Sequence, residues 1–389
     1  MGNTPSVQRL LERLVAFDTT SHESTREIVE FICNLVDRPG IRITRHPDSS
    51  GRKENLVISA GPPVDSGTRP GLLLCGHLDV VPATEPDWTS PPFELIDGGD
   101  RWVGRGTADM KGFLALSLHR LVALDSDKLV HPLILLFTRD EELGSLGAAE
   151  LIRDADPGDT WPTAAVVGEP TSLRAIRLHK GHLRLDLAFK GRAAHSGYPH
   201  RGRNAIEVAG RAVRALAGLR TKLEQERGPN SRFFSETPFV AFNLGIIEGG
   251  SAVNVIPAHC RLRMGLRPLP GDVAADLTAR VEECLMNALE PGEWSLSVDN
   301  DSPPLETAED APIHQSLRGL LNQRESFGVS FASDAGYLSA LGIEAVLYGP
   351  GSIEVAHKAN EFVPKAEMAK AAVVLEQLVE EYCCNPEAA

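Results

Sequence analysis

Short apolar runs closed by turn residues constrain the fold of this chain more than any other feature of its sequence. Four of them have the length and composition of strands buried in an α/β sheet: 55–60, 71–75, 132–138 and 164–168. Segments 112–124 and 146–152, which lie between them, have helical periodicity. We therefore expect an α/β domain in which helices flank both faces of a mixed or parallel sheet.

A different pattern begins near residue 180. Residues 182–190 alternate between apolar and polar side chains, and the predicted elements that follow complete the order β-α-β-β-α-β of a ferredoxin-like unit. The α/β pattern then returns near residue 308. We expect a catalytic domain interrupted by a smaller inserted α+β domain, with the boundaries 1–180 for its first part, 181–301 for the insert and 302–389 for its second part.

Composition excludes several classes of partner. The 39 Lys and Arg residues against 53 Asp and Glu give a formal net charge of −14, which repels phosphate backbones, so nucleic acid is not an expected partner. No apolar stretch approaches the roughly 18 residues of a membrane span, so no membrane is expected either. The 6 cysteines are scattered without CxxC spacing, which favours reduced thiols and a cytoplasmic location.

A histidine or a carboxylate follows five separate predicted strands or turns. In an open α/β sheet, the carboxyl ends of the strands are where ligands bind. The acidic run 140–142 also ends a buried strand, where neighbouring carboxylates repel one another unless a cation lies nearby. The five residues in this position are His77, Asp109, Glu142, Glu169 and His357.

This set of donors indicates a metal centre. Imidazole and carboxylate ligands without a thiolate suit zinc or cobalt, and an odd number of carboxylates suits two ions that share one bridge. Such a pair polarises a carbonyl group and lowers the pKa of a bound water to about 7. Glu141, beside Glu142, is then the natural proton shuttle.

Two other patterns have simpler interpretations. The His-x-Asp sequence at 46–48 repeats the spacing of His77 and Asp79, but no predicted strand precedes it, so we interpret it as a solvated turn. The glycine-rich segment 104–112 lacks the GxxxxGK[ST] frame of a phosphate loop, and its aspartate would repel a phosphate. Neither pattern therefore predicts a second site.

Taken in order, the motifs resemble those of the di-zinc aminoacylase/acetylornithine deacetylase family, which includes succinyl-diaminopimelate desuccinylase and glutamate carboxypeptidases. The segments that carry the resemblance are His77-Leu78-Asp79, Gly106–Gly112, Asp140–Glu142, Gly168-Glu169-Pro170 and Gly349–His357. The similarity runs over almost the whole chain. It implies a zinc-peptidase-like mixed sheet flanked by helices, with an inserted ferredoxin-like lid domain that dimerises.

The resemblance also implies a division of the ligands between two divalent ions, zinc or possibly cobalt. His77 and Glu169 would hold one ion, and Glu142 and His357 would hold the other. Asp109 would bridge the two ions.

Further catalytic groups follow from the same resemblance. Asp79 would orient His77 without ligating an ion itself, and Glu141 would be the general base. In the insert, Ala194-His195-Ser196-Gly197 is similar to a segment whose histidine reaches the partner's active site across a dimer interface. The chain is therefore expected to form a homodimer through its inserted domain.

Several residues resemble the family's substrate-binding groups. Asn254 and Arg267 look like its substrate-facing amide and guanidinium, although Gly265 stands where the family usually has an aspartate. Arginine suits an amino-acid carboxylate, which the backbone amides around Gly351 could also bind. Asp334 is the expected carboxylate for a cationic substrate side chain.

Within the family, segment 349–361 most resembles the acetylornithine deacetylases, which implies hydrolysis of N-acetyl-L-ornithine and related short N-acyl amino acids in arginine biosynthesis. A succinyl-diaminopimelate desuccinylase and a dipeptidase or carboxypeptidase are the alternatives. The motifs hold no further arginine for the second carboxylate of a succinylated substrate. A catalytically inactive binding protein is disfavoured, because no expected ligand is replaced and Glu141 and Asp79 are both present.

Overall fold

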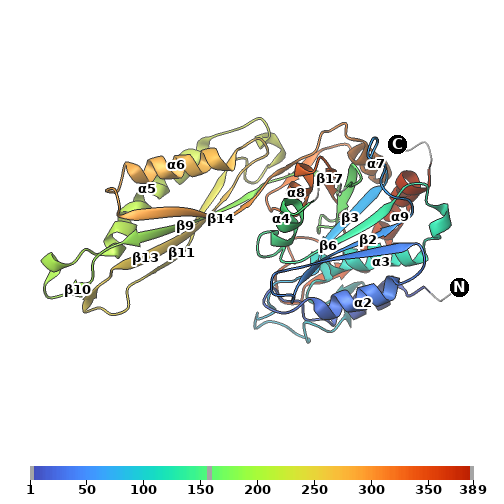
Figure 1. Ribbon diagram of the computed structural model, residues 1–389, viewed down its shortest axis with the longest axis horizontal. Helices are drawn as coiled ribbons and strands as arrows, with labels where there is room; N and C mark the ends of the chain where they lie inside the picture. The colour runs from blue at the N-terminus through green and yellow to red at the C-terminus, as the bar shows by residue number, and fades with distance from the viewer. Residues whose placement is uncertain (1–3, 156–159, 386–389) are drawn as a thin grey trace. The chain divides into compact units, whose positions relative to one another are not determined.

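The computed structural model describes residues 4–155 and 160–385 of the chain. The chain divides into two compact units (Figure 1). The first unit comprises Met1–Arg177, Thr307–Phe327 and Ser333–Ala389, and the second comprises Leu178–Glu306 and Gly328–Ala332.

A mixed sheet organises the first unit, with the strand order β1-β2-β6-β3-β7-β17-β8. Its strands are β1 (Ile41–Pro47), β2 (Glu54–Ala60), β3 (Leu72–His77), β6 (Leu133–Thr138), β7 (Ala164–Val167), β8 (Ile176–His179) and β17 (Glu344–Leu347). The four neighbours β6, β3, β7 and β17 are mutually parallel, whereas β1, β2 and β8 run antiparallel to their neighbours. The carboxyl ends of four strands therefore meet at one edge of the sheet.

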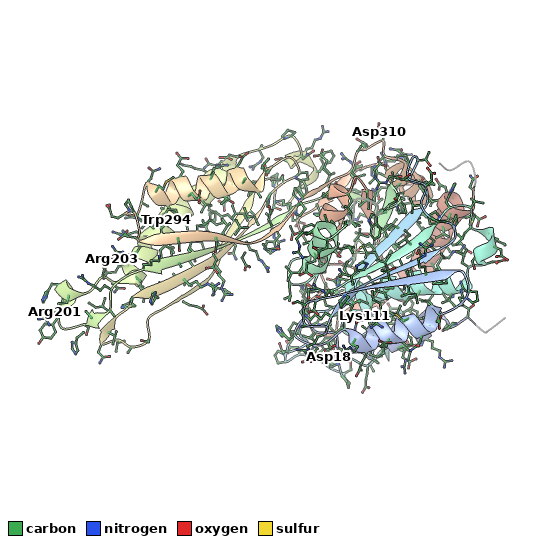
Figure 2. The ribbon with its side chains drawn as sticks, viewed as in Figure 1. Asp18, Lys111, Arg201, Arg203, Trp294 and Asp310 are labelled. Atoms are coloured by element: carbon green, nitrogen blue, oxygen red, sulfur yellow. The ribbon has the colours of Figure 1, made fainter. Side chains whose placement is uncertain are left out.

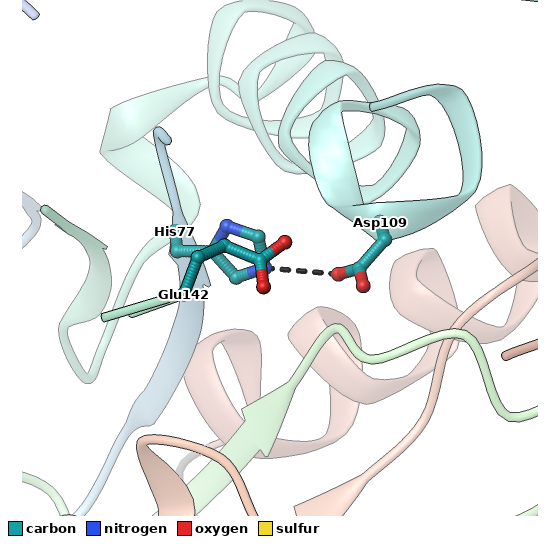
Figure 3. A group of neighbouring side chains, drawn as sticks. All are labelled: His77, Asp109 and Glu142. Atoms are coloured by element: carbon teal, nitrogen blue, oxygen red, sulfur yellow. Dashed lines mark hydrogen bonds and ion pairs between the residues drawn. The ribbon is translucent and has the colours of Figure 1, made fainter. Parts of the chain in front are cut away.

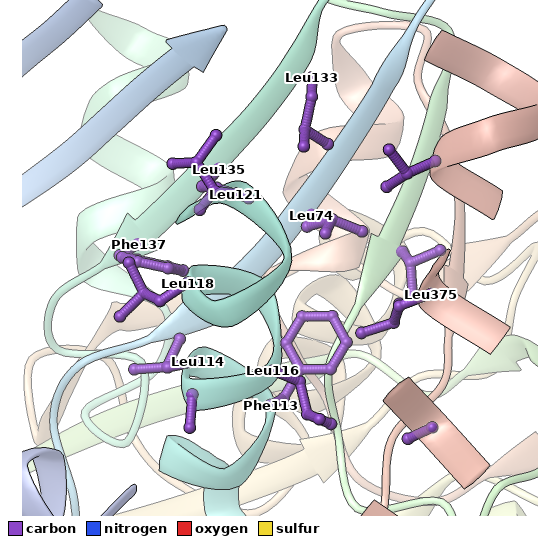
Figure 4. Packing of buried hydrophobic residues seen from close by; sticks show 14 of the residues in the cluster. Leu74, Phe113, Leu114, Leu116, Leu118, Leu121, Leu133, Leu135, Phe137 and Leu375 are labelled. Carbon is purple, nitrogen blue, oxygen red and sulfur yellow. The ribbon is translucent and has the colours of Figure 1, made fainter. Parts of the chain in front are cut away.

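Helices cover this sheet on both faces. They are α1 (Val7–Val15), α2 (Arg26–Val36), α3 (Gly112–Ala123), α4 (Leu146–Arg153), α7 (Pro312–Leu321), α8 (Ala335–Ala340) and α9 (Lys365–Val379). Every residue of β3 and β6 is buried, and successive residues of a strand point to opposite faces. On one face, Leu74, Leu133 and Leu135 pack with Phe113 and Leu121 of α3 (Figure 4). The expected mixed sheet flanked by helices is confirmed.

A small sheet completes the first unit. Its strands run in the order β18-β5-β4 and are β4 (Ile96–Asp97), β5 (Arg101–Val103) and β18 (Phe362–Pro364). Val103 pairs with Phe362, and the backbone N–H of Gly104 donates to the carbonyl of Glu361 at 2.9 Å. This pairing brings the C-terminal part of the chain beside the glycine-rich turn that leads to Asp109.

The second unit is an α+β sandwich. Its antiparallel sheet has the order β11-β13-β9-β14 and, with its helices, follows the sequence β-α-β-β-α-β. The elements are β9 (His182–Lys190), α5 (Ala205–Gln225), β11 (Ala241–Gly249), β13 (His259–Arg267), α6 (Ala274–Met286) and β14 (Trp294–Ser302). Leu183, Leu185, Leu187 and Phe189 are buried in one core with both helices, so the other face of the sheet carries the polar residues.

Four shorter strands complete the second unit and its boundary. β10 (Ala194–His195) pairs with β12 (Val255–Ile256), and β15 (Leu305–Glu306) and β16 (Phe327–Val329) pair with β8. Within residues 4–155 and 160–385, no helix is both long enough and apolar enough to cross a membrane.

One local expectation is wrong. A strand does precede the His-x-Asp sequence at 46–48, because β1 includes His46 and Pro47 and pairs with β2 along its whole length. As an edge strand with no fully buried residue, β1 lacks the apolar run that revealed the central strands. The turn itself is as expected, since the Asp48 carboxylate accepts the backbone N–H groups of Arg52 and Lys53.

Candidate active site

The parallel strands deliver the expected ligands to one edge of the sheet. His77 is the last residue of β3, and the acidic run 140–142 follows the end of β6. Glu169 comes two residues after β7, and the loop after β17 leads to His357. Residues far apart in the sequence therefore meet because their strands are parallel neighbours.

Asp109 lies between two imidazoles. Its Oδ1 is 2.9 Å from His77 Nε2, and its Oδ2 is 3.2 Å from His357 Nε2. Figure 3 shows the first of these contacts, with Glu142 beside it. The same His357 nitrogen is 3.0 Å from Glu142 Oε1. One carboxylate thus directs one oxygen to each histidine, as a residue that bridges two cations would.

Three of these side chains form a compact group of metal-ligating atoms. One ligand atom each from His77, Asp109 and Glu142 lies within 4.8 Å of the others. Glu169 is not part of this tightest group, although its carboxyl is buried and its pKa is raised well above the usual range by burial and by the charge of Asp109. The group therefore gathers nitrogen and oxygen donors of the kind that bind zinc or cobalt.

The charges of the site support the presence of a cation. Burial, followed by the charge of Asp109, raises the pKa of Glu142. Hydrogen bonds with Asp109 and Glu142 raise the pKa of His357 to about 10. Buried carboxyls that are this close repel one another, and a positive charge between them relieves the repulsion. The residues present therefore fit a divalent metal ion.

Asp79 organises the loop after β6. Its carboxylate accepts the backbone N–H groups of Glu141 and Glu142 and the hydroxyl of Ser21. The expected contact with His77 is made differently, because His77 Nδ1 donates to the backbone carbonyl of Asp79 at 2.8 Å while the carboxylate lies 4.0 Å away. The backbone carbonyl of Asp79 therefore orients His77, and its carboxylate holds the loop that carries Glu141 and Glu142.

Glu141 lies beside the metal-ligating group. The hydroxyl of Ser145 donates to Glu141 Oε1 at 3.2 Å. Burial raises the pKa of the Glu141 carboxyl well above its usual range. Among the described residues, no guanidinium or ammonium is hydrogen-bonded to this carboxyl.

Sequence reasoning missed the residue that shapes the turn of Asp109. The buried carboxylate of Glu361 accepts the backbone N–H groups of Gly106, Ala108 and Asp109 at 2.9–3.1 Å. It also pairs with Arg105 at 2.9 Å. Glu361 falls in the segment used for the resemblance, but nothing in the sequence shows that it reaches back to this turn.

Lys111 is a second buried charge near the site. It is fully enclosed, and its Nζ donates to the carbonyl of Phe17 at 2.8 Å. Figure 2 shows Lys111 and the neighbouring Asp18 in the first unit. Burial lowers the pKa of the Lys111 ammonium to about 7. This contact ties the segment after α1 to the start of α3.

Two expected substrate-binding residues of the first unit have protein partners. The N–H of Gly351 donates to Glu367 Oε2 at 2.8 Å, and the N–H of Gly349 donates to Thr171 Oγ1 at 3.2 Å. Both amides therefore have protein acceptors in this structure. Asp334 is buried and accepts a hydrogen bond from Thr138 Oγ1 at 2.5 Å, so it holds the end of β6.

In the second unit, the structure brings two expected residues together and separates a third. His195 is exposed on β10, and the N–H of the next residue, Ser196, donates to the carbonyl of Asn254 at 3.0 Å. Asn254 lies just before β13, which begins at His259, whereas Arg267 is the last residue of that strand. At about 3.4 Å per residue, the two ends of β13 are roughly 27 Å apart, so Arg267 is separated from Asn254 and His195 within one chain.

Two further arginines near Arg267 were not anticipated. Arg184 and Arg263 line the same cavity as Arg267. Arg263 lies four residues before Arg267 on β13. Arg184 lies on β9 and comes beside them because it pairs with Gly265. Neither arginine lies in the motifs that carry the family resemblance.

An α/β sheet whose parallel strands end beside a cluster of imidazole and carboxylate side chains is typical of a metal-dependent hydrolase. The chain belongs to peptidase family M20/M25/M40, whose family model matches residues 73–381. The family expected from the motifs is confirmed.

Curated relatives agree with this assignment. An acetylornithine deacetylase from Proteus mirabilis is 36% identical over 384 residues, which cover 98% of this chain and 94% of the relative. An acetylornithine deacetylase from Pasteurella multocida is 35% identical over 393 residues, which cover 98% of this chain and 100% of the relative.

Solved structures share the fold. The aminopeptidase PepT from Bacillus cereus has a TM-score of 0.72 at 19% identity, with 97% of this chain and 98% of that chain covered. A family M20 metallo-carboxypeptidase from Sulfolobus solfataricus has a TM-score of 0.74 at 16% identity, with 97% and 99% covered.

Proposed function

We propose that this protein hydrolyses N-acetyl-L-ornithine to ornithine and acetate, together with related short N-acyl amino acids, as a cytoplasmic step of arginine biosynthesis. The curated relatives that carry the name acetylornithine deacetylase match nearly the whole chain, which supports this substrate. All six cysteines are free thiols, as suits a reducing compartment.

The single observation that carries the metal mechanism is the position of Asp109, with one carboxylate oxygen directed at each of His77 and His357. We infer that two divalent ions, zinc or cobalt, bind here. His77 and Glu169 would hold one, Glu142 and His357 would hold the other, and Asp109 would bridge them. When bound, these ions supply polarisation of the acyl carbonyl and a more acidic water.

The protein's own groups then move the proton. Glu141 accepts a proton from the attacking water and delivers it to the leaving amine, so one carboxylate acts first as base and then as acid. Asp79 positions this carboxylate, because it holds the N–H of Glu141 and of the adjacent Glu142.

The remaining proposal concerns the insert and substrate binding. Residues 181–301 form a lid domain between the two catalytic segments 1–180 and 302–389, and the chain dimerises through this domain. His195 of the partner subunit then donates to the oxyanion that develops during acyl transfer. Arg267 binds the substrate's α-carboxylate, and Asn254 lies beside His195 to assist it.

Asp334 remains the proposed carboxylate for a cationic side chain. Its contact with Thr138 Oγ1 means that a substrate ammonium has to compete with that hydroxyl for the buried carboxylate. Because an ammonium forms charge-assisted hydrogen bonds, it is the stronger donor of the two.

Comparison of kcat/KM for four substrates tests the proposal, with zinc- and cobalt-loaded enzyme: acetylornithine, acetylcitrulline, acetylmethionine and succinyl-diaminopimelate. A dipeptide series tests the peptidase alternative. We expect acetylornithine to be the best substrate. A preference of more than about tenfold for the succinylated compound or a dipeptide, roughly 1.4 kcal/mol in transition-state binding, would overturn the substrate assignment. No turnover of any of them would favour a binding protein.

A further inference from the structure

A cavity of about 400 Å³ lies in the second unit, whereas the residues proposed to hold metal belong to the first unit. Its wall includes Arg184, Arg263 and Arg267, with His182 and Asn243 between them. All of its lining residues belong to the second unit, so the cavity is formed within that unit alone.

The pairing register explains how three arginines come to surround one point. Gly265 of β13 pairs with Arg184 of β9 on one side and with Asn243 of β11 on the other. Arg263 and Arg267 lie two residues before and after Gly265, on the same face of the strand. The face is the one opposite the buried Leu262, Met264 and Leu266.

The absence of a side chain at Gly265 leaves room at the centre. A Cβ there would have as its nearest neighbour His182 Nε2 at 3.3 Å, and the glycine does not have a positive φ. A larger side chain would project into the space among the three guanidinium groups. Gly245, at the bulge of β11, also lines the cavity and adds no side chain to its wall.

The cavity is positively charged. Asp299 is its one acidic lining residue, and it pairs with Arg184 at 3.2 Å. Arg263 pairs with Glu248, outside the cavity, at 3.5 Å. Burial and the charges of Arg267 and Arg184 lower the pKa of His182 to about 3, so this ring is neutral near pH 7 and able to form hydrogen bonds with a ligand.

A fourth arginine on the same face of β13, Arg261, differs from the three in the cavity wall because it does not line the cavity. Arg261 lies two residues before Arg263, but its guanidinium forms a close pair with the carboxylate of Asp186, with its Nε at 2.7 Å from Oδ2. Its charge is neutralised in place, and it does not line the cavity. Arg261 is therefore a matched control for Arg263.

We propose that this cavity binds a small oxyanion with two or more negative charges, either a dicarboxylate or a phosphate. Guanidinium groups form paired hydrogen bonds with carboxylate and phosphate oxygens, and several of them together favour a ligand of higher charge. The volume lies within the range of small-molecule sites. The site goes beyond the proposed function, in which Arg267 alone binds the substrate's carboxylate, because its recognition depends on Arg184 and Arg263.

Isothermal titration of the full-length protein tests the proposal at low ionic strength, where charge interactions are least screened. The probes are inorganic phosphate, succinate and acetate. We expect saturable binding of phosphate or succinate and at least about tenfold weaker binding of acetate, since one charge cannot engage several arginines. The tighter of the two multivalent probes identifies which oxyanion chemistry the cavity prefers.

Variants locate the binding. Arg184→Ala and Arg263→Ala should each weaken it about tenfold or more, and Gly265→Asp should abolish it by placing a carboxylate at the centre. Arg261→Ala and Gly265→Ala should retain it. Asp109→Ala should also retain it, which separates this site from any phosphate bound at the metal centre and from failure of the proposed catalysis.

The opposite results would overturn the proposal. These are no saturable binding of phosphate or succinate, equal binding of acetate, or equal weakening by Arg261→Ala and Arg263→Ala. Circular dichroism and melting temperature of each variant show whether a loss of binding comes from unfolding. Should Arg263→Ala fail to fold, Arg263→Gln provides the same test with less change in packing.

Discussion

The carboxylate of Asp79 accepts the backbone N–H group of Glu141 at 3.0 Å. It also accepts that of Glu142 at 3.2 Å, and it is completely buried. One acid therefore sets the position of both the proposed base and its neighbouring metal ligand, although it touches neither carboxylate.

Replacement of Asp79 should expose this dependence. Asp79→Ala leaves two N–H groups without their acceptor, at a cost of about 1–3 kcal/mol for each buried group. We expect kcat to fall more than tenfold, with a smaller fall for Asp79→Asn, because its amide oxygen can still accept one of the bonds. Steady-state kinetics and metal analysis check this. A kcat within twofold of wild type for Asp79→Ala would contradict the positioning role.

The bridging position of Asp109 makes a prediction about metal stoichiometry. Asp109→Ala should lose both ions, because each proposed site loses a ligand, whereas Glu169→Ala should chiefly weaken one. Elemental analysis of dialysed protein gives the number of ions per chain. Two ions retained in Asp109→Ala would show that the carboxylate does not bridge.

Much of the first unit follows from its sequence because its central strands are buried on both faces. Residues 72–75 and 133–137 are continuous apolar runs for that reason, and the strand positions place His77 and Glu142 at one edge. The alternation at 182–190 is equally informative, since β9 buries only one face. Periodicity thus predicts an element when burial is regular along it.

Long-range contacts limit what the sequence predicts. Glu361 holds the turn before Asp109 from about 250 positions away, and no local pattern reports that hydrogen bonding. Arg184 becomes a neighbour of Arg263 and Arg267 only through the register of β9 and β13, in which a shift of one residue would turn it to the opposite face. The exposed edge strand β1 escaped notice because it has no apolar run.

The pair of Glu361 and Arg105 should be important for stability. Both side chains are 1% exposed, and Glu361→Ala would leave Arg105 without its buried partner, which typically costs about 3–5 kcal/mol. Urea unfolding measures the loss. Glu85→Ala is the matched control, since Glu85 contacts the same guanidinium at 2.6 Å but is 29% exposed, and we expect a cost of about 1 kcal/mol or less. Equal losses in the two variants would contradict this account.

The buried imidazole of His179 predicts a dependence of stability on pH. Burial, and then the charge of Arg267, lower its pKa from its usual 6.5 to about 4. The unfolded chain therefore takes up the proton first as the pH falls, so stability is complete above about pH 6.5 and declines between pH 6.5 and 4. His179→Gln should decline less over this window, whereas the exposed His46→Gln should follow wild type. Urea midpoints at several pH values check this, and parallel curves for His179→Gln and wild type would contradict it.

The proposed dimer predicts complementation between two inactive variants. Glu141→Gln should keep its metal and lose turnover by orders of magnitude, because the amide cannot accept the water's proton. His195→Ala should lose turnover because the developing oxyanion lacks a donor.

If His195 acts in the partner's site, a mixed dimer contains one site with both wild-type residues. Random subunit exchange makes half of the dimers mixed, so activity should recover to about a quarter of wild type. Size-exclusion chromatography with differently tagged subunits verifies the exchange. No recovery after verified exchange would mean that His195 does not act across a dimer interface, while the metal centre of the first unit would be unaffected by that result.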